Sequence, residues 1–134
     1  MKSMFFHSIA VCALSVSCFV SGCYLPIRHL VYNNTGEPLK IVIGETVREI
    51  KTHTTRKLVI DAYGEQVLIQ KGQMIWRYFV VIGKDEEMDF DNRIVRVQIE
   101  SDGTLYVLRP KTKFPADVGA HSDCVIQVLK PVCR

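Results

Sequence analysis

The alternation of side chains between residues 93 and 108 constrains the fold most. Positions 95, 97 and 99 carry Val, Val and Ile, whereas positions 96, 98 and 100 carry Arg, Gln and Glu. A period of two predicts a strand with one buried face and one wet face. Ser101, Asp102 and Gly103 form a turn signal, in which Gly103 supplies a positive φ. Residues 104–108 then run back, so the sequence predicts a β-hairpin.

The sequence on either side of this hairpin shows the same pattern of short strands separated by turns. Turn signals fall at residues 33–36, 52–55, 62–65 and 71–72, and segments rich in Val, Ile and Leu lie at residues 28–32, 39–44, 46–51, 57–61, 66–70 and 125–129. No segment shows a helical period of ten residues or more, and residues 84–92 would form one helical turn at best. Eight or nine strands spaced about ten residues apart predict an all-β, antiparallel β-sandwich, with a small closed β-barrel as the alternative.

Residues 74–82 form the longest apolar run. Alternation places Trp76 and Tyr78 on one face of this strand and Ile75 and Phe79 on the other. A strand that is apolar on both faces is typical of the interior of a fold. We therefore expect this strand to be central, with Trp76 packed in the core rather than serving as a platform for a ligand.

The first 22 residues depart from the β pattern. Lys2 is their only charged side chain, and the apolar run of residues 4–20 ends in the small residues Ser21 and Gly22. A basic start, an apolar centre and small residues at the end are typical of a signal peptide. The alternative is a transmembrane anchor, because residues 4–22 are long enough to span a bilayer. Polar interruptions, and the lack of a basic cluster directly after the run, favour the signal peptide.

The sequence Val20-Ser21-Gly22-Cys23 resembles the lipobox of bacterial lipoprotein precursors, in which an aliphatic residue, a small residue and Gly or Ala precede a cysteine. The resemblance covers only residues 1–23. It implies cleavage between Gly22 and Cys23, a diacylglyceryl group on the thiol of Cys23, and an acyl chain such as palmitate on the new amine. Two or more chains anchor a protein stably. Tyr24, where retained lipoproteins have Asp, implies the outer membrane, and we expect the periplasmic face.

The mature chain would begin almost without a tether. Residues 24–26 alone separate Cys23 from the first strand-like run at Ile27, and four residues reach about 14 Å when extended. We therefore expect the domain close to the membrane, with the start of its first strand facing the lipid. Residues 23–134 number 112, which suits one β domain.

The charge of the mature chain argues against nucleic-acid binding. Without Lys2 there remain 16 Lys and Arg against 14 Asp and Glu, a net charge of +2. These charges are interspersed, whereas nucleic-acid binders cluster their basic residues. The short basic stretch at residues 109–113 is expected to be a solvated turn.

Five cysteines can be assigned by position. Cys12 and Cys18 lie in the leader and Cys23 carries lipid, which leaves Cys124 and Cys133. We expect these two to form a disulfide in the oxidising periplasm, where closing a loop of ten residues would stabilise the fold by about 2.7 kcal/mol. A disulfide needs Cα atoms within about 7 Å of each other. The chain would therefore have to reverse direction at residues 130–131.

Catalytic motifs are sparse. The mature chain has two serines, Ser101 in the hairpin turn and Ser122 in His121-Ser122-Asp123. These three adjacent residues spell a catalytic triad, but adjacent side chains do not converge as a triad requires. A zinc site needs four ligands, and only His121 and Asp123 lie near the two cysteines. We therefore predict that the protein is not an enzyme and holds no zinc.

The acidic run at residues 85–91 is the one weak candidate for a metal site. Asp85, Glu87, Asp89 and Asp91 alternate, so their oxygens are conceivable ligands for Ca²⁺. The run lacks the glycine and the distal glutamate of an EF-hand, which favours a solvated loop. Two other titratable residues, His29 and His53, are isolated, and we expect both at the surface or at a sheet edge.

Taken together, these features predict a non-enzymatic, lipid-anchored envelope protein that acts by protein–protein contacts. It would be an accessory subunit of an envelope or secretion assembly, or an inhibitor or immunity protein. One alternative is a module that binds a small ligand, a glycan or Ca²⁺ through residues 84–92. A less favoured alternative is a cell-wall hydrolase. No cofactor is expected beyond the covalent acyl anchor on Cys23.

Overall fold

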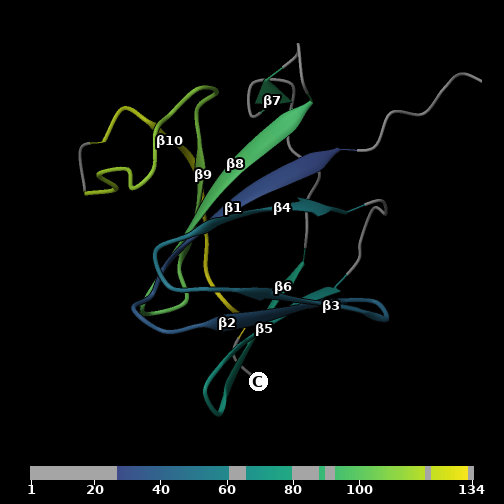
Figure 1. Cartoon of the computed structure of the whole chain (residues 1–134). Helices are drawn as coiled ribbons and strands as arrows, with labels where there is room; N and C mark the ends of the chain where they lie inside the picture. The colour runs from purple at the N-terminus through teal and green to yellow at the C-terminus, as the bar shows by residue number, and fades with distance from the viewer. Residues whose placement is uncertain (1–26, 61–65, 80–87, 90–92, 120–121, 133–134) are drawn as a thin grey trace, which may run out of the picture.

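The computed structural model describes residues 27–60, 66–79, 88–89, 93–119 and 122–132 (Figure 1). Within them the chain forms ten strands and no helix, which confirms the all-β prediction. The strands are β1 (Arg28–Asn34), β2 (Leu39–Ile43), β3 (Thr46–Ile50), β4 (Thr55–Val59), β5 (Gln66–Lys71), β6 (Met74–Phe79), β7 (Met88–Asp89), β8 (Ile94–Glu100), β9 (Leu105–Leu108) and β10 (Val125–Leu129).

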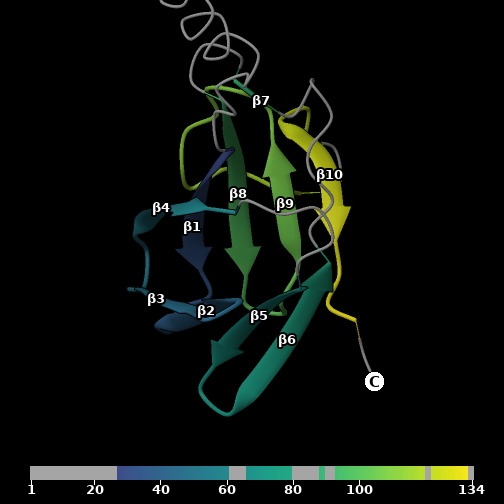
Figure 2. The same cartoon turned by 90° about the vertical axis from the view of Figure 1, so that its right-hand side faces the viewer.

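These strands lie in two sheets rather than in one closed barrel (Figures 1 and 2). The six-stranded sheet has the order β10-β9-β8-β1-β4, and β7 pairs with the start of β8. The four-stranded sheet has the order β3-β2-β5-β6. The predicted sandwich is therefore confirmed, with ten strands in place of eight or nine.

The hairpin predicted from residues 93–108 is present as β8 and β9. The two strands pair antiparallel from Arg96 opposite Leu108 to Ile99 opposite Leu105. Gly103 has φ +84°, as expected for this turn. The backbone N–H of Thr104 donates to the carboxylate of Asp102 at 2.9 Å, and this hydrogen bond lowers the pKa of Asp102.

One strand pair departs from the antiparallel prediction. β1 and β8 are parallel, in register from Arg28 opposite Ile94 to Asn34 opposite Glu100. The two strands enter the sheet from the same end and run in the same direction (Figure 2). Alternation along a strand reports which face is buried and carries no information about the direction of its neighbour, so the sequence did not reveal this pair.

The prediction that residues 74–82 form a central strand is wrong. β6 is the edge strand of the four-stranded sheet and pairs only with β5 among the described strands. Trp76 is buried in the core as predicted, whereas Ile75 on the opposite face is 60% exposed. The described residues therefore leave the second apolar face of this strand uncovered.

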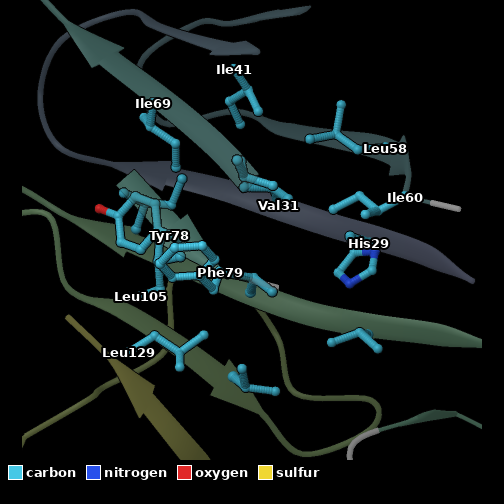
Figure 3. A pocket seen from close by; sticks show the side chains of 15 residues that line it. His29, Val31, Ile41, Leu58, Ile60, Ile69, Tyr78, Phe79, Leu105 and Leu129 are labelled. Atoms are coloured by element: carbon cyan, nitrogen blue, oxygen red, sulfur yellow. The ribbon is translucent and has the colours of Figure 1, made fainter. Parts of the chain in front are cut away.

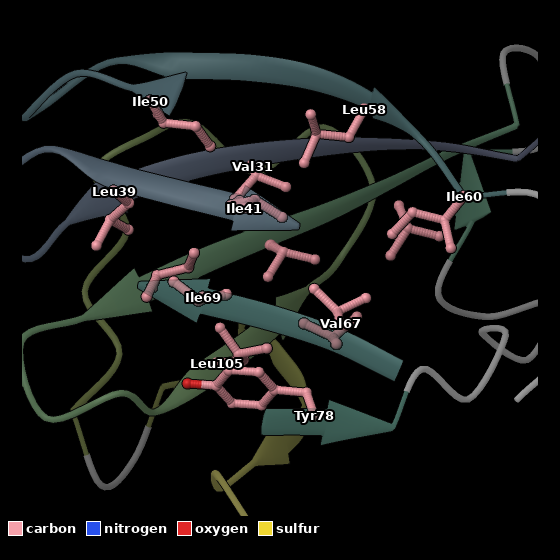
Figure 4. Packing of buried hydrophobic residues seen from close by; sticks show 14 of the residues in the cluster. Val31, Leu39, Ile41, Ile50, Leu58, Ile60, Val67, Ile69, Tyr78 and Leu105 are labelled. Carbon is pink, nitrogen blue, oxygen red and sulfur yellow. The ribbon is translucent and has the colours of Figure 1, made fainter. Parts of the chain in front are cut away.

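The core lies between the two sheets, and both contribute to it (Figure 4). Val31, Leu105 and Leu58 come from the six-stranded sheet, and Ile41 and Ile69 come from the four-stranded sheet. Asn33, at the end of β1, is fully buried but satisfied: its amide donates to the carbonyl oxygens of Glu37 and Ile50. The bond to Ile50 joins the two sheets at this end of the molecule.

The expected disulfide required the chain to reverse direction after β10, and the chain does not do so. The backbone N–H of Val132 donates to the carbonyl oxygen of Arg77 in β6 at 2.9 Å, so the chain continues toward the other sheet. Cys124 is a free thiol at the start of β10. Cys133 lies outside the described residues, and the reversal that would bring it back is not formed through Val132.

Candidate functional site

The outer face of the six-stranded sheet is covered by the loop between β9 and β10. Gln98 was expected on a wet face, yet its side chain is fully buried. Its amide donates to the carbonyl oxygen of Ala116 at 3.0 Å, and its oxygen accepts the N–H of Ala116 at 2.7 Å. We call residues 109–119 the covering loop. The two bonds of Gln98 hold it against β8 as a neighbouring strand would.

Aromatic stacking fixes the covering loop at a second point. The ring of Phe114 stacks on Tyr32 of β1, with centroids 5.3 Å apart and planes inclined by 10°. The guanidinium of Arg96 lies 6.0 Å from the centroid of the same ring. Stacked and cation–π contacts of this kind contribute beyond the area they bury. The stretch that the sequence suggested would be a solvated turn therefore ends in a packed aromatic contact.

The outer face of the four-stranded sheet has no such cover among the described residues. Strand pairing places Val47, Val42 and Leu68 side by side in one row across β3, β2 and β5. Val47 is 54% exposed, and Val42 and Leu68 are half-buried. Ile75 of β6, which is 60% exposed, adds a fourth apolar side chain to this face in the neighbouring row. We call these four side chains, the row of Val47, Val42 and Leu68 together with the neighbouring Ile75, the apolar row.

Charges of both signs border the apolar row. Glu49 of β3 lies opposite Lys40 of β2 in the strand register. Both side chains are on the outer face, in the same row as Ile75. Arg77 of β6 lies opposite Leu68 in the strand register, so it is at the end of the apolar row on the edge strand of the sheet. The outer face of this sheet therefore has an apolar centre with a mixed polar border, which is the composition of many protein interfaces.

The interior of the sandwich holds a small apolar cavity of about 70 Å³ (Figure 3). Its lining comes from both sheets and is aliphatic apart from His29, Tyr78 and Phe79. His29 and Ile60 lie at one end of the cavity, and Tyr78 and Leu105 lie at the other. Phe79 lines the cavity and is also 54% exposed, so the cavity reaches the surface beside this ring.

His29 is the unexpected residue of this cavity. It was predicted at the surface or at an edge, but it is 6% exposed on a strand with neighbours on both sides. Its Nδ1 atom is buried and has no hydrogen-bond partner among the described residues. Burial lowers the pKa of His29 to about 4, because the cation would lose its hydration. The ring is therefore neutral at pH 7 and retains an unused hydrogen-bonding atom.

Tyr78 carries the other polar group of the cavity lining, and it is already used. Its hydroxyl donates to the carbonyl oxygen of Gly103 in the β8–β9 turn. Burial raises the pKa of this hydroxyl well above its usual value, so it stays protonated. Among the described lining residues, only His29 therefore offers a polar atom to the cavity.

The weak Ca²⁺ candidates are only partly described. Asp85, Glu87 and Asp91 lie outside the described residues, and Asp89 is buried in β7, where its backbone pairs with Ile94. A buried strand residue differs from the solvated loop that the sequence suggested. The described residues contain no group of three His, Cys, Asp or Glu side chains arranged to hold a metal ion.

The residues considered for nucleophilic chemistry are dispersed. The Oγ atom of Ser122 lies 2.8 Å from the Sγ atom of Cys124, and Asp123 is exposed. His121 lies outside the described residues. Ser101 is in the β8–β9 turn, where its carbonyl oxygen accepts a hydrogen bond from Lys71 at 2.9 Å. The described part of the chain thus brings no base to either serine.

The predicted lipidation site, Gly22 and Cys23, lies outside the described residues, as does the rest of the leader. The chain that the structure does describe contains no helix suited in length and hydropathy to crossing a bilayer. Comparisons with protein-family models, with curated proteins and with solved structures found no match.

Sequence reasoning missed both features that define the candidate sites. β2, β3 and β5 each contribute one apolar side chain to the apolar row, Val42, Val47 and Leu68, but the exposure of this row depends on which face the other sheet covers. His29 sits between Arg28 and Leu30 in a segment that lacks clean alternation, so no periodic signal placed it inside.

Proposed function

We propose that this chain is a lipid-anchored, non-enzymatic envelope protein that acts by binding another protein through the apolar row. The observation that carries the proposal is the exposure of Val47 and Ile75 on an outer face that no described segment covers. Exposed apolar side chains grouped on one face and bordered by polar residues mark interaction surfaces. The lipid anchor is proposed from the lipobox at residues 20–23.

The charges around the apolar row favour a protein partner over a lipid surface. A face that docks on anionic lipid would carry Lys and Arg without acids among them. Here Glu49 lies directly beside Lys40, and Arg77 stands at the far edge. A complementary partner would place an apolar patch on the row, an acid near Lys40 or Arg77, and a base near Glu49.

The size of this face indicates a contact that depends on the membrane. Four strands about 4.8 Å apart and five residues long cover roughly 300 Å². A stable interface buries about 800 Å² on each partner, so the sheet face alone would bind weakly in solution. Anchoring both partners to one membrane raises their effective concentration toward the millimolar range, where weak contacts become occupied. This suits an accessory subunit or an inhibitor held at the same surface as its target.

Photocrosslinking in the native envelope tests this proposal. A photoreactive residue at position 47 or 75 should give a discrete protein adduct, and one at Lys57, which is exposed on a strand of the other sheet, should not. The protein identified in the adduct must then bind the purified chain. This binding should weaken at least tenfold in Ile75→Glu and remain in Val59→Glu, which makes a matched change at a 49% exposed position on β4 of the other sheet.

Three outcomes would reject the proposal. Equal crosslinking from positions 47 and 57 would show that the face is not selective. Adducts with lipid alone would make the face a membrane contact. Adducts with a second copy of this chain, together with dimers in sedimentation of the purified protein, would make it a self-association surface.

A further inference from the structure

We propose that the cavity between the two sheets binds an uncharged aliphatic molecule whose single polar group hydrogen-bonds to Nδ1 of His29. The proposal concerns the interior of the sandwich and is independent of the apolar row on its outer face. It stands on three observations: a cavity that reaches the surface, a lining that is almost entirely apolar, and one buried polar atom of that lining that has no partner among the described residues.

The first step of the argument concerns Nδ1 of His29. A buried polar atom without a partner is costly, and native structures keep few of them. Backbone pairing of β1 with β4 and β8 holds the Cα of His29 in the middle of the sheet, and the ring is 6% exposed on the core side of that sheet. The atom therefore stands ready for a partner that comes from outside the described chain.

Water is a poor candidate for that partner. An ordered buried water needs two to four polar neighbours, although a cavity of about 70 Å³ has room for one. His29 offers one such atom, and the hydroxyl of Tyr78 is already bonded to Gly103. The remaining lining gives a water molecule nothing to bond to, whereas an aliphatic chain would gain from the same surface.

The cavity also selects the charge and size of the ligand. A carboxylate or an amine would lose its hydration in this lining and would meet no opposite charge, so a neutral group is favoured. The volume is below the 150 Å³ or so of an apolar cavity that takes benzene. A five-carbon chain is bulkier than benzene, so the cavity would enclose its polar end and first carbons, and the remaining carbons would leave beside Phe79.

Alcohol binding measured by NMR tests the proposal on the purified protein at pH 7. The probes are 1-pentanol, n-pentane as its apolar match, and pentanoate as its charged match. We expect 1-pentanol to bind roughly 3- to 10-fold more tightly than n-pentane, the factor that one hydrogen bond supplies. The imidazole nitrogen signals of His29 should shift as 1-pentanol is added and stay unchanged with n-pentane. Pentanoate should bind weakest.

Two variants and a control separate the hydrogen bond from the space. His29→Leu should bind 1-pentanol and n-pentane equally well. Val107→Leu adds a methylene to the cavity lining and should weaken both probes several-fold. Val47→Leu makes the same change on the outer face and should leave both affinities unchanged. If His29→Leu does not fold, the nitrogen signals of the wild-type protein still decide the matter.

Several results would overturn the proposal. Equal affinity of the wild-type protein for 1-pentanol and n-pentane would remove the role of His29. Undiminished binding to Val107→Leu would place the probes outside the cavity. Nitrogen signals of His29 that do not respond to any probe, or a bound water seen on Nδ1 that 1-pentanol does not displace, would show that the site takes no such ligand.

Discussion

The two sheets of this molecule differ in what covers their outer faces. On the six-stranded sheet, Gln98 and Tyr32 are buried because the covering loop bonds to one and stacks on the other. On the four-stranded sheet, Val47 and Ile75 are each more than half exposed. The polar glutamine is thus hidden while the apolar residues are in the open. The difference teaches that an outer face is decided by the loops that cross it and cannot be inferred from its own side chains.

The largest change in stability that we expect comes from His29, in the core between the two sheets. The changes expected on the two outer faces are smaller. The pKa of His29 is about 4 in the folded protein and near 6.5 in the unfolded chain. As pH falls from 6.5 to 4, the unfolded chain takes up a proton that the folded protein resists. The free energy of unfolding should therefore fall by about 3 kcal/mol across this window and recover above pH 6.5.

Urea unfolding at pH 7 and pH 4 measures this change, and His29→Leu provides the control. The carboxylates titrate in both proteins, so the difference between the two pH profiles isolates the contribution of His29. Identical profiles for the wild-type protein and the variant would show that the ring is not held neutral by burial.

The second prediction compares two glutamines, one on each outer face. Gln98→Ala removes both bonds to Ala116 and leaves the backbone N–H and carbonyl of Ala116 without these partners. It should lower the free energy of unfolding by about 2 kcal/mol. Gln70→Ala removes one exposed bond to the carbonyl oxygen of Gly72 and should cost less than about 0.5 kcal/mol. Urea unfolding gives both values, and hydrogen exchange at the amide of Ala116 should accelerate only in Gln98→Ala. Equal losses would break the contrast between the faces.

A third comparison removes an apolar side chain from each face. Phe114→Ala abolishes the stacking on Tyr32 and should destabilise the fold by roughly 1.5 kcal/mol. The covering loop should then be cut faster by protease. Ile75→Ala removes a side chain that is 60% exposed and should cost less than about 0.5 kcal/mol. A larger loss for Ile75→Ala than for Phe114→Ala would mean that the face bearing the apolar row is the covered one.

The smallest effect on stability is expected where the proposed function predicts the largest effect on binding. Val47→Glu should change the free energy of unfolding by less than about 0.5 kcal/mol, because the position is open to solvent. It should also raise the solubility of the purified protein. Thermal unfolding and light scattering check both expectations. A marked loss of stability would show that Val47 contributes to the core and is unsuited to contact a partner.

The sequence predicted local structure well and the assembly of that structure poorly. The hairpin of β8 and β9 followed from the alternation at positions 95 to 100 and from Gly103, because both signals lie within the segment itself. Gln98 was placed on the correct face, yet its burial depends on Ala116, 18 residues further on. β6 was predicted to be central from its two apolar faces, since composition cannot tell a covered face from an open one.

The candidate sites were the least predictable part for the same reason. His29 is buried because β4 and β8 lie on either side of it. Its neighbours in the register, Leu58 and Val95, are far from it along the chain. The proposed lipid anchor at Cys23 is the opposite case, because a lipobox is a local signal and needs no tertiary structure. The sequence therefore carries a local signal for the proposed location and no comparable signal for what the protein would bind there.

The parallel pairing of β1 with β8 has a consequence for how the chain is made. Residues 28–34 are synthesised early, but their partner strand follows only after 66 further positions. Until then one edge of β1 has exposed N–H and C=O groups, which are a template for pairing with another molecule. Long-range pairing of this kind also slows folding. A nascent chain would thus carry an unpaired edge on β1 until residue 100 has been made.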